Sequence, residues 1–115
     1  MSQLFNIFYL DDSDKEWEKV FDGVYRKILG YNDSLMMVKV RIDGGIRFPE
    51  HSHPHVQTTY VASGRYEVTV GGHKQVLSSG DSYFVLPDVP HSTVCIESGV
   101  LIDVFSPCRE DFLKK

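Results

Sequence analysis

Two histidines placed two residues apart give this sequence its clearest chemical signal. Side chains at positions i and i+2 of a β-strand point to the same face, so His51 and His53 can aim their imidazoles at one point. Gln57 and His91 could complete a cluster of nitrogen and oxygen atoms there. Neutral imidazole suits zinc, copper, iron and nickel, and a carbonyl oxygen suits harder cations. The pattern predicts one divalent metal ion inside a small β-barrel, and its alternative is a pair of strand histidines hydrogen-bonded to the backbone.

Short apolar runs separated by turn residues would position these side chains. Turns recur about every ten residues, which is typical of an all-β sandwich or barrel rather than of alternating helices and strands. Residues 65–70 alternate cleanly, with Tyr66 and Val68 on one face, and Gly71-Gly72 predicts a tight hairpin after them. The predicted strands are 4–10, 24–29, 35–42, 46–53, 57–62, 65–70, 73–77, 83–86, 92–96 and 100–105.

Two short helices are predicted outside these strands. Residues 12–19 combine capping residues with early acidic residues, which favours a helix start. Near the other end, Ser106 is a candidate N-cap and Pro107 fits the first helical position. Acidic residues follow at once and two lysines come last, which is the order that the helix dipole favours. We therefore expect a short C-terminal helix.

Composition places the chain among ordinary globular proteins. It has 115 residues, of which 42% are hydrophobic and 24% charged, enough for one domain with a core that needs no disulfides. The formal net charge of −4 argues against nucleic acid as a partner. No stretch approaches the ~20 apolar residues of a membrane helix, so no membrane partner is expected. Cys95 and Cys108 do not make a disulfide framework, so we expect a reduced, cytoplasmic protein.

Four further residues are candidates for catalysis or substrate binding. Asp103 lies inside the apolar run 100–105, where a carboxylate is costly unless it is paired or functional. It is therefore a candidate general acid or base, and the alternative is a structural ion pair with an arginine. Arg109 could clamp a substrate carboxylate or be an ordinary charged residue of the C-terminal helix. Arg47 is a further substrate-binding candidate, and Phe105 could stack on a sugar face or pack in the core.

The glycines around the histidines resemble the two sequence motifs of the cupin superfamily. The first motif runs from Gly45 through His51 and His53 to Gly64, and Gln57 stands where many cupins have glutamate. The second begins at Gly80 and includes His91, and three of its usual residues are replaced, by Leu86, Asp88 and Cys95. The resemblance implies an all-β fold, the cupin-type double-stranded β-helix (jelly-roll) barrel, as a single domain over residues 1–115 with its core at about 35–105. It also implies that the metal ion is held by His51, His53, Gln57 and His91.

A narrower resemblance covers the chain from about residue 18 to the end. The run His-Ser-His-Pro-His-Val-Gln at 51–57 and the run Leu-Ile-Asp-Val-Phe-Ser-Pro-Cys-Arg-Glu-Asp-Phe at 101–112 resemble the small pectin-degradation cupins of the KdgF type. Val56 and Cys108 depart from that family, in which glutamate and proline are frequent at these positions. The family opens the ring of 4,5-unsaturated uronate monosaccharides and holds a divalent metal with three histidines and one glutamine.

What the resemblance implies is a metal-dependent, isomerase- or lyase-like enzyme for a small anionic sugar. Asp103 would move the proton, Arg109 would hold the substrate carboxylate, and the ion would be zinc, nickel, manganese or iron. Small cupins often dimerise through their outer strands, so we expect a homodimer. Two alternatives stay open: a non-catalytic sugar-binding or sensor cupin, and an iron-dependent cupin dioxygenase.

Overall fold

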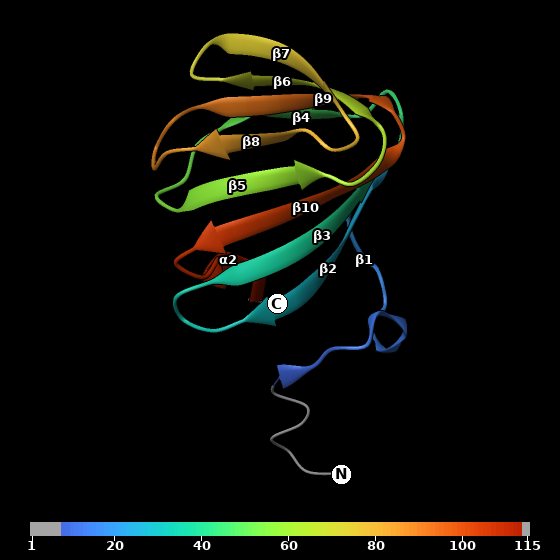
Figure 1. The fold of residues 1–115 in the computed structure, drawn as a ribbon, viewed down its shortest axis with the longest axis vertical. Helices are drawn as coiled ribbons and strands as arrows, with labels where there is room; N and C mark the ends of the chain where they lie inside the picture. Colours follow the sequence, from blue (N-terminus) through green and yellow to red (C-terminus); the bar gives the residue numbers. More distant parts are fainter. Residues whose placement is uncertain (1–7, 114–115) are drawn as a thin grey trace.

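The computed structural model describes residues 8–113, which form mainly two antiparallel β-sheets that curve around one core (Figure 1). The larger sheet contains β1 (Glu18–Phe21), β2 (Val24–Tyr31), β3 (Met36–Ile42), β5 (Val56–Val61), β8 (Ser82–Val85) and β10 (Gly99–Ser106). The smaller sheet contains β4 (Arg47–His51), β6 (Arg65–Val70), β7 (His73–Ser78) and β9 (His91–Glu97). Their spatial orders are β1-β2-β3-β10-β5-β8 and β4-β9-β6-β7. Strands distant in the sequence are thus neighbours in space, and the expected all-β jelly-roll barrel is confirmed.

Strand pairing brings the two sequence motifs together. β10 lies inside the larger sheet, between β3 and β5, and its register places Asp103 opposite Thr59 and Phe105 opposite Gln57. In the smaller sheet, β4 pairs with β9 so that His51 lies opposite His91. The residues that carry chemistry in the sequence therefore come from neighbouring strands of both sheets.

The space between the sheets is filled by alternate residues of the strands. Met36 and Val38 of β3 are fully buried, whereas the intervening Met37 is 40% exposed. Tyr66 and Val68 of β6 are buried in the same cluster from the opposite sheet, which confirms the alternation predicted for residues 65–70. Side chains that are alternately buried and exposed are expected in a strand that has one face on the core and the other in solvent.

Every strand predicted from residue 24 onward is present, with its ends moved by at most about two residues. The hairpin between β6 and β7 is also present, because Val70 pairs with His73 across the two glycines. Gly71 and Gly72 have φ values of 56° and 84°. Both values lie in the left-handed region, which glycine adopts without steric cost and which a two-residue hairpin of this kind needs.

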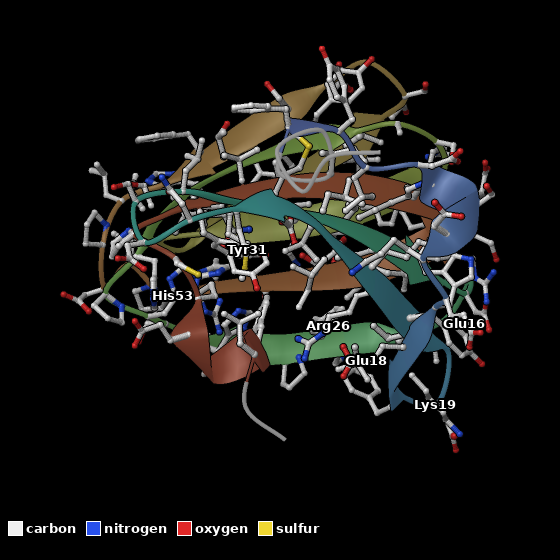
Figure 2. All side chains as sticks on the ribbon, turned by 90° about the horizontal axis from the view of Figure 1, so that it is seen from below. Glu16, Glu18, Lys19, Arg26, Tyr31 and His53 are labelled. Carbon is white, nitrogen blue, oxygen red and sulfur yellow. The ribbon has the colours of Figure 1, made fainter. Side chains whose placement is uncertain are left out.

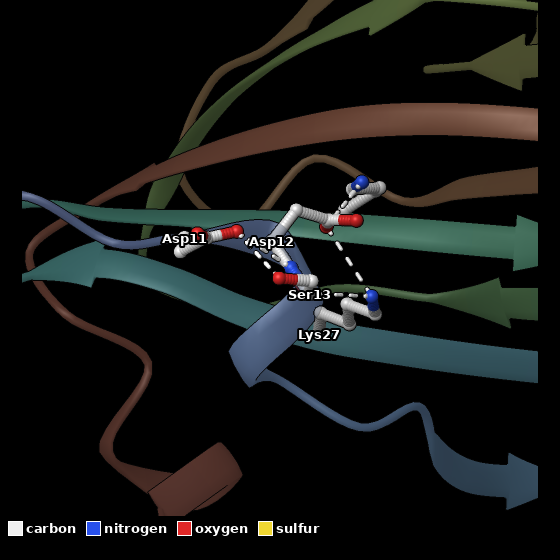
Figure 3. A network of polar contacts seen from close by, with 5 residues as sticks. Asp11, Asp12, Ser13 and Lys27 are labelled. Atoms are coloured by element: carbon white, nitrogen blue, oxygen red, sulfur yellow. Dashed lines mark hydrogen bonds and ion pairs between the residues drawn. The ribbon is translucent and has the colours of Figure 1, made fainter.

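The segment before β2 differs from the prediction. In place of a helix over residues 12–19, the chain forms a single 3-10 turn, η1 (Asp12–Asp14), and β1 begins at Glu18. Asp12 accepts a hydrogen bond from Lys39 at 2.6 Å and forms an ion pair with Lys27 at 3.3 Å (Figure 3). Because these lysines project from β2 and β3, contacts with the sheet outweigh local helix propensity. Of the predicted strand 4–10, residues 4–7 lie outside the described residues, and residues 9 and 10 belong to no strand.

The C-terminal helix is present but begins later than predicted. α2 (Glu110–Leu113) starts after Pro107 rather than at it. Ser106 is the last residue of β10, pairs with Val56, and donates its hydroxyl hydrogen to the carbonyl of Ser34 at 2.7 Å. Ser106, the predicted N-cap, therefore belongs to a paired strand instead. Across residues 8–113, no helix is long and apolar enough to span a membrane.

Candidate metal centre

The three motif histidines converge between the sheets. His51 ends β4, His91 begins β9, and His53 follows β4 in the connection to β5. The ring centroids of His51 and His91 lie 4.2 Å apart, and those of His53 and His91 lie 4.9 Å apart. One ring nitrogen of each residue lies within 4.8 Å of those of the other two. The sequence prediction that these imidazoles aim at one point agrees with this geometry.

Backbone carbonyls fix the tautomer of all three rings. In each residue Nδ1 lies at hydrogen-bond distance from a carbonyl oxygen two residues away, at 2.9 to 3.0 Å. A carbonyl oxygen can only accept, so each Nδ1 carries the proton and each Nε2 presents a lone pair. The pairs are His51 with Pro49, His53 with His55, and His91 with Val89.

Gln57 adds a fourth lone pair to the same point. Its Nε2 donates to Oγ1 of Thr59 at 2.9 Å, which turns its carbonyl oxygen toward His53. That oxygen, Oε1, lies 2.9 Å from Nε2 of His53, so two acceptors face each other with no proton between them. Nε2 of His91 is buried and has no hydrogen-bond partner among the described residues. Buried acceptors are normally satisfied, so this arrangement calls for a cation.

The donor set fits a divalent transition metal ion. Three imidazole nitrogens and one amide oxygen suit zinc, iron, nickel or manganese, whereas thiolate ligands are absent from the cluster. Burial lowers the pKa of His91 to about 4 and also lowers the pKa of His53, so both rings are neutral at pH 7 and their lone pairs are free. Gln57 and His91 are only 5% and 3% exposed and His53 is also buried, whereas His51 is exposed, so three of the four ligand residues are shielded from water.

A cavity of about 320 Å³ lies beside this cluster, between the two sheets. His51, Gln57 and His91 contribute to its wall, and apolar residues cover most of the rest, among them Phe48 and Leu101. Small-ligand pockets are about 300–1,000 Å³, so the cavity is at the small end of that range. Of the residues that the sequence nominated for catalysis or binding, the lining includes Asp103, Phe105 and Arg109.

Arg47 lies elsewhere. It is exposed and is not among the residues that line the cavity, whereas its neighbour Phe48 is. Successive side chains of a strand point to opposite faces, so the inward position of Phe48 on β4 turns Arg47 away. A role for Arg47 in substrate binding therefore stays a prediction without support from the lining.

Asp103 is the acid of the cavity. Its Oδ1 accepts a hydrogen bond of 2.6 Å from Oγ1 of Thr59. Burial raises the pKa of Asp103 to about 6, although the Thr59 hydroxyl and the charge of Arg109 act in the opposite direction. No arginine forms a hydrogen bond with it in the described chain, so the alternative of a structural ion pair is not what the geometry shows. A carboxyl group with a pKa near 6 can both accept and return a proton near neutral pH.

Arg109 immediately precedes α2, and its guanidinium group lies over two aromatic rings. Its guanidinium carbon is 4.2 Å from the ring centroid of Phe112 and 5.0 Å from that of Phe105. Nε and Nη2 donate to the two carboxylate oxygens of Asp111 at 3.1 and 2.9 Å. Asp111 and the rings therefore hold the guanidinium plane in one orientation, which is the preorganisation that a carboxylate-binding arginine needs.

Three residues of the site were missed by the sequence reasoning: Arg26 and Tyr83, which line the cavity, and Thr59, which lies behind its wall and is hydrogen-bonded to Asp103. Arg26 comes from β2, its guanidinium carbon lies 4.1 Å from the Phe112 centroid, and its Nε donates to Glu18 at 2.9 Å (Figure 2). Tyr83 comes from β8, and burial together with the charge of Asp103 raises its pKa, so it stays a neutral hydroxyl. Thr59 could have been found, because it shares a strand face with Gln57 two residues earlier. Arg26 could not have been found in this way, because it belongs to no sequence motif.

Comparisons with known proteins agree with this geometry. A family model described as "Cupin domain" matches residues 38–105. The Pectin degradation protein KdgF of Dickeya dadantii (strain 3937) is 44% identical over 107 residues, which are 91% of this chain and 97% of that protein.

Two solved structures are similar along most of their length. The first is an RmlC-like cupin from Shewanella frigidimarina, with a TM-score of 0.88, 44% identity, and coverage of 90% of this chain and 94% of that one. The second is KdgF from Halomonas sp., with a TM-score of 0.88, 35% identity, and coverage of 90% and 96%. The barrel, the converging histidines and these similarities lead to one conclusion: the chain belongs to the cupin family and, within it, to the group of small cupins related to KdgF.

Proposed function

We propose that this chain is an enzyme that opens the ring of 4,5-unsaturated uronate monosaccharides with the help of one bound divalent metal ion. The observation that carries the proposal is that the converging ligand cluster adjoins one cavity, which three of its residues line together with Asp103 and Arg109. A relative 44% identical to the chain is named as a pectin degradation protein, and pectin is a polymer of galacturonate. The cavity volume of about 320 Å³ suits a single sugar ring better than an oligosaccharide.

Ring opening of such a sugar is an isomerisation. The bond between C1 and the ring oxygen breaks, C1 becomes an aldehyde carbon, and the electron pair stays on the former ring oxygen as an enolate beside the carboxylate. The enolate is then protonated at C4 and becomes a ketone. One proton leaves the C1 hydroxyl and one arrives at C4, so the reaction needs no oxidant, reductant or second substrate.

The ion would be held by Nε2 of three imidazole rings and Oε1 of one amide, from His51, His53, His91 and Gln57. Once bound there, a divalent ion supplies a Lewis acid that stabilises negative charge on a substrate oxygen. All four ligands are neutral, so none of them cancels the charge of the ion, and an anionic substrate is favoured. The carbonyls that hold each Nδ1–H keep the rings in the required tautomer.

Asp103 would move the proton. In its ionised form it accepts the proton of the C1 hydroxyl, and in its protonated form it returns one to C4. Burial raises the pKa of Asp103 to about 6 in the metal-free protein and so favours uptake of a proton, while the bound cation would favour the ionised form that accepts one. Thr59 fixes one carboxylate oxygen and leaves the other, Oδ2, without a hydrogen bond to the described residues.

Arg109 would bind the carboxylate of the sugar, and Phe105 would stack on the ring. Asp111 occupies Nε and Nη2 of Arg109, which leaves Nη1 for the substrate. Arg26 lines the same cavity and lies against the same Phe112 ring, so it supplies a second cation where the sequence had suggested Arg47. Two guanidinium groups in a mostly apolar cavity select a substrate with at least one negative charge.

The assembly and the compartment belong to the same proposal. We expect a homodimer formed through outer strands, which light scattering at micromolar concentration can test. A cytoplasmic location agrees with the two cysteines, Cys95 and Cys108, which are both free and buried.

A turnover assay tests the proposed reaction. The purified protein should accelerate the loss of ring-form absorbance of 4,5-unsaturated galacturonate and yield the linear keto-uronate without oxygen consumption. The double variant His51→Ala/His53→Ala should lose both metal and activity, whereas His73→Ala, in the exposed hairpin strand, should keep both. Binding of the sugar by metal-loaded wild type without conversion would favour the sensor alternative. Oxygen consumption with a thiol or diketone substrate would favour the dioxygenase.

A further inference from the structure

We propose that Thr59 is a positioning residue whose single hydroxyl group fixes both the amide orientation of Gln57 and the carboxylate of Asp103. This inference rests on the metal site of the proposed function, and it concerns a residue that no sequence motif singles out. Thr59 is not itself one of the proposed metal ligands. It acts through the two groups to which it is hydrogen-bonded.

Thr59 lies at the centre of a buried hydrogen-bond chain. It is 0% exposed, it shares a face of β5 with Gln57, and strand register places it opposite Asp103 on β10. Its Oγ1 is 2.9 Å from Nε2 of Gln57 and 2.6 Å from Oδ1 of Asp103. The chain continues from Oε1 of Gln57 to Nε2 of His53 at 2.9 Å. Four side chains from two strands and one connection are thus linked in a single line.

The directions of these hydrogen bonds follow from proton counting. A hydroxyl has one hydrogen to donate, and an ionised carboxylate can only accept. The hydrogen of Thr59 therefore goes to Asp103. Oγ1 can only accept from its other neighbours, which are the amide of Gln57 and the hydroxyl of Tyr83. Of the two ends of the Gln57 amide, only the NH₂ end can donate to it, so the carbonyl end is turned toward His53 and the ligand cluster.

Without the hydroxyl, the opposite orientation of the amide becomes favourable. A flipped Gln57 would donate an N–H to Nε2 of His53, which carries a lone pair because its Nδ1–H is held by the carbonyl of His55. That hydrogen bond would satisfy both groups and remove one oxygen and one nitrogen from the set of free ligand atoms. Thr59 therefore opposes an arrangement in which the protein blocks its own metal site.

Metal affinity tests this role independently of turnover. The matched variants are Thr59→Val, which keeps the shape and removes the hydroxyl, and Thr59→Ser, which keeps the hydroxyl. Thr58→Val makes the same change one residue earlier, on the exposed face of β5. Protein stripped with a chelator is titrated with Co²⁺ in competition with a chromophoric chelator, and the visible bands of the bound ion are recorded. Thermal melting of the metal-free proteins checks the fold.

Thr59→Val should bind Co²⁺ about 10- to 100-fold more weakly, which is the usual effect of removing a group that orients a metal ligand. Its visible bands should change, because one oxygen ligand is replaced or lost. Thr59→Ser should stay within about 3-fold of wild type, because it restores the hydroxyl, and Thr58→Val should not differ from wild type. Unchanged affinity and spectrum in Thr59→Val would overturn the inference.

A second background separates orientation from packing. In Gln57→Glu the side chain has two equivalent oxygens and no N–H, so it presents an oxygen to the ion whichever way it turns. Adding Thr59→Val to this background should therefore weaken Co²⁺ binding by less than about 3-fold, a strong departure from additivity. An equal loss in both backgrounds would mean that Thr59 acts by packing and would overturn the inference. Absence of Co²⁺ binding by wild type would overturn the metal site and this inference together, whereas normal binding without uronate turnover would overturn only the proposed reaction.

Discussion

Replacing Asp103 by asparagine should stabilise the metal-free protein while abolishing most of its activity. Burial raises the pKa of Asp103 from its ordinary value of 3.8 to about 6. One pKa unit corresponds to about 1.4 kcal/mol, so ionisation of this carboxyl should cost the folded chain about 3 kcal/mol relative to the unfolded chain. Asparagine has nearly the same shape, its oxygen can still accept the hydrogen bond of Thr59, and it does not ionise.

The sign of the pH dependence follows from the raised pKa. Below about pH 4 the carboxyl is protonated in both states, so no stability is lost. Between about pH 4 and pH 6 it ionises only in the unfolded chain, and the free energy of unfolding of the wild type falls by about 3 kcal/mol relative to Asp103→Asn. Above about pH 6 both states are ionised and the difference stays constant.

Urea unfolding of the chelator-treated proteins measures the difference in free energy of unfolding between the wild type and Asp103→Asn. The measurements are made at about pH 4, 5, 6 and 8, a range that covers the pKa of the carboxyl in the unfolded and in the folded chain. The metal must be absent, because a nearby cation would favour the ionised carboxylate and lower its pKa. Asp14→Asn in the exposed turn η1 controls for the loss of one negative charge. Turnover of the metal-loaded Asp103→Asn should fall by about 10²- to 10⁴-fold. A free-energy difference that does not change with pH would refute the buried, proton-binding description of Asp103, and full activity would refute its catalytic role.

Three further substitutions separate binding from catalysis. Arg109→Ala should raise KM by about 10- to 100-fold with a smaller fall in kcat, because a charged hydrogen bond contributes about 1.5–3 kcal/mol to substrate binding; a fall in kcat at constant KM would contradict the clamp. Arg26→Gln should also raise KM, whereas Arg65→Gln, which removes an exposed arginine paired with Glu97, should leave the kinetics unchanged; identical kinetics in both variants would exclude Arg26 from the site. Gln57→Glu should keep the ion but turn over more slowly, because the added negative charge weakens the Lewis acid and repels an anionic substrate; unchanged turnover would remove this electrostatic argument.

The strands were predictable where one periodic signal dominates. Alternation over residues 65–70 and the Gly71-Gly72 turn are local features, and β6, β7 and the hairpin between them follow from them directly. Residues 12–19 were predicted as a helix because their caps and acidic residues satisfy a local rule. The competing contacts of Asp12 with Lys27 and Lys39 come from strands that no local rule brings near.

The site was predictable to the extent that its residues sit in spaced motifs. His51, His53 and His91 were nominated by spacing, and the structure brings their ring nitrogens together. Arg26 and Arg47 show the limit of such reasoning. Both are arginines on strands, but only Arg26 lines the cavity. Its direction depends on the pairing of β2 with β3 and on the twist of the sheets, which the spacing of residues in the sequence does not reveal.

Metal dependence of the ring-opening reaction is the measurement that bears most directly on the proposed function. Protein stripped of metal is titrated with a divalent ion such as Ni²⁺ or Zn²⁺, and turnover of 4,5-unsaturated galacturonate is followed together with bound metal. Activity should be absent without the ion, rise in proportion to bound metal, and reach its maximum at about one ion per chain, as expected for one cluster of neutral ligands. Full turnover by the stripped protein, or no turnover at full metal occupancy, would contradict a metal-dependent uronate ring-opening enzyme.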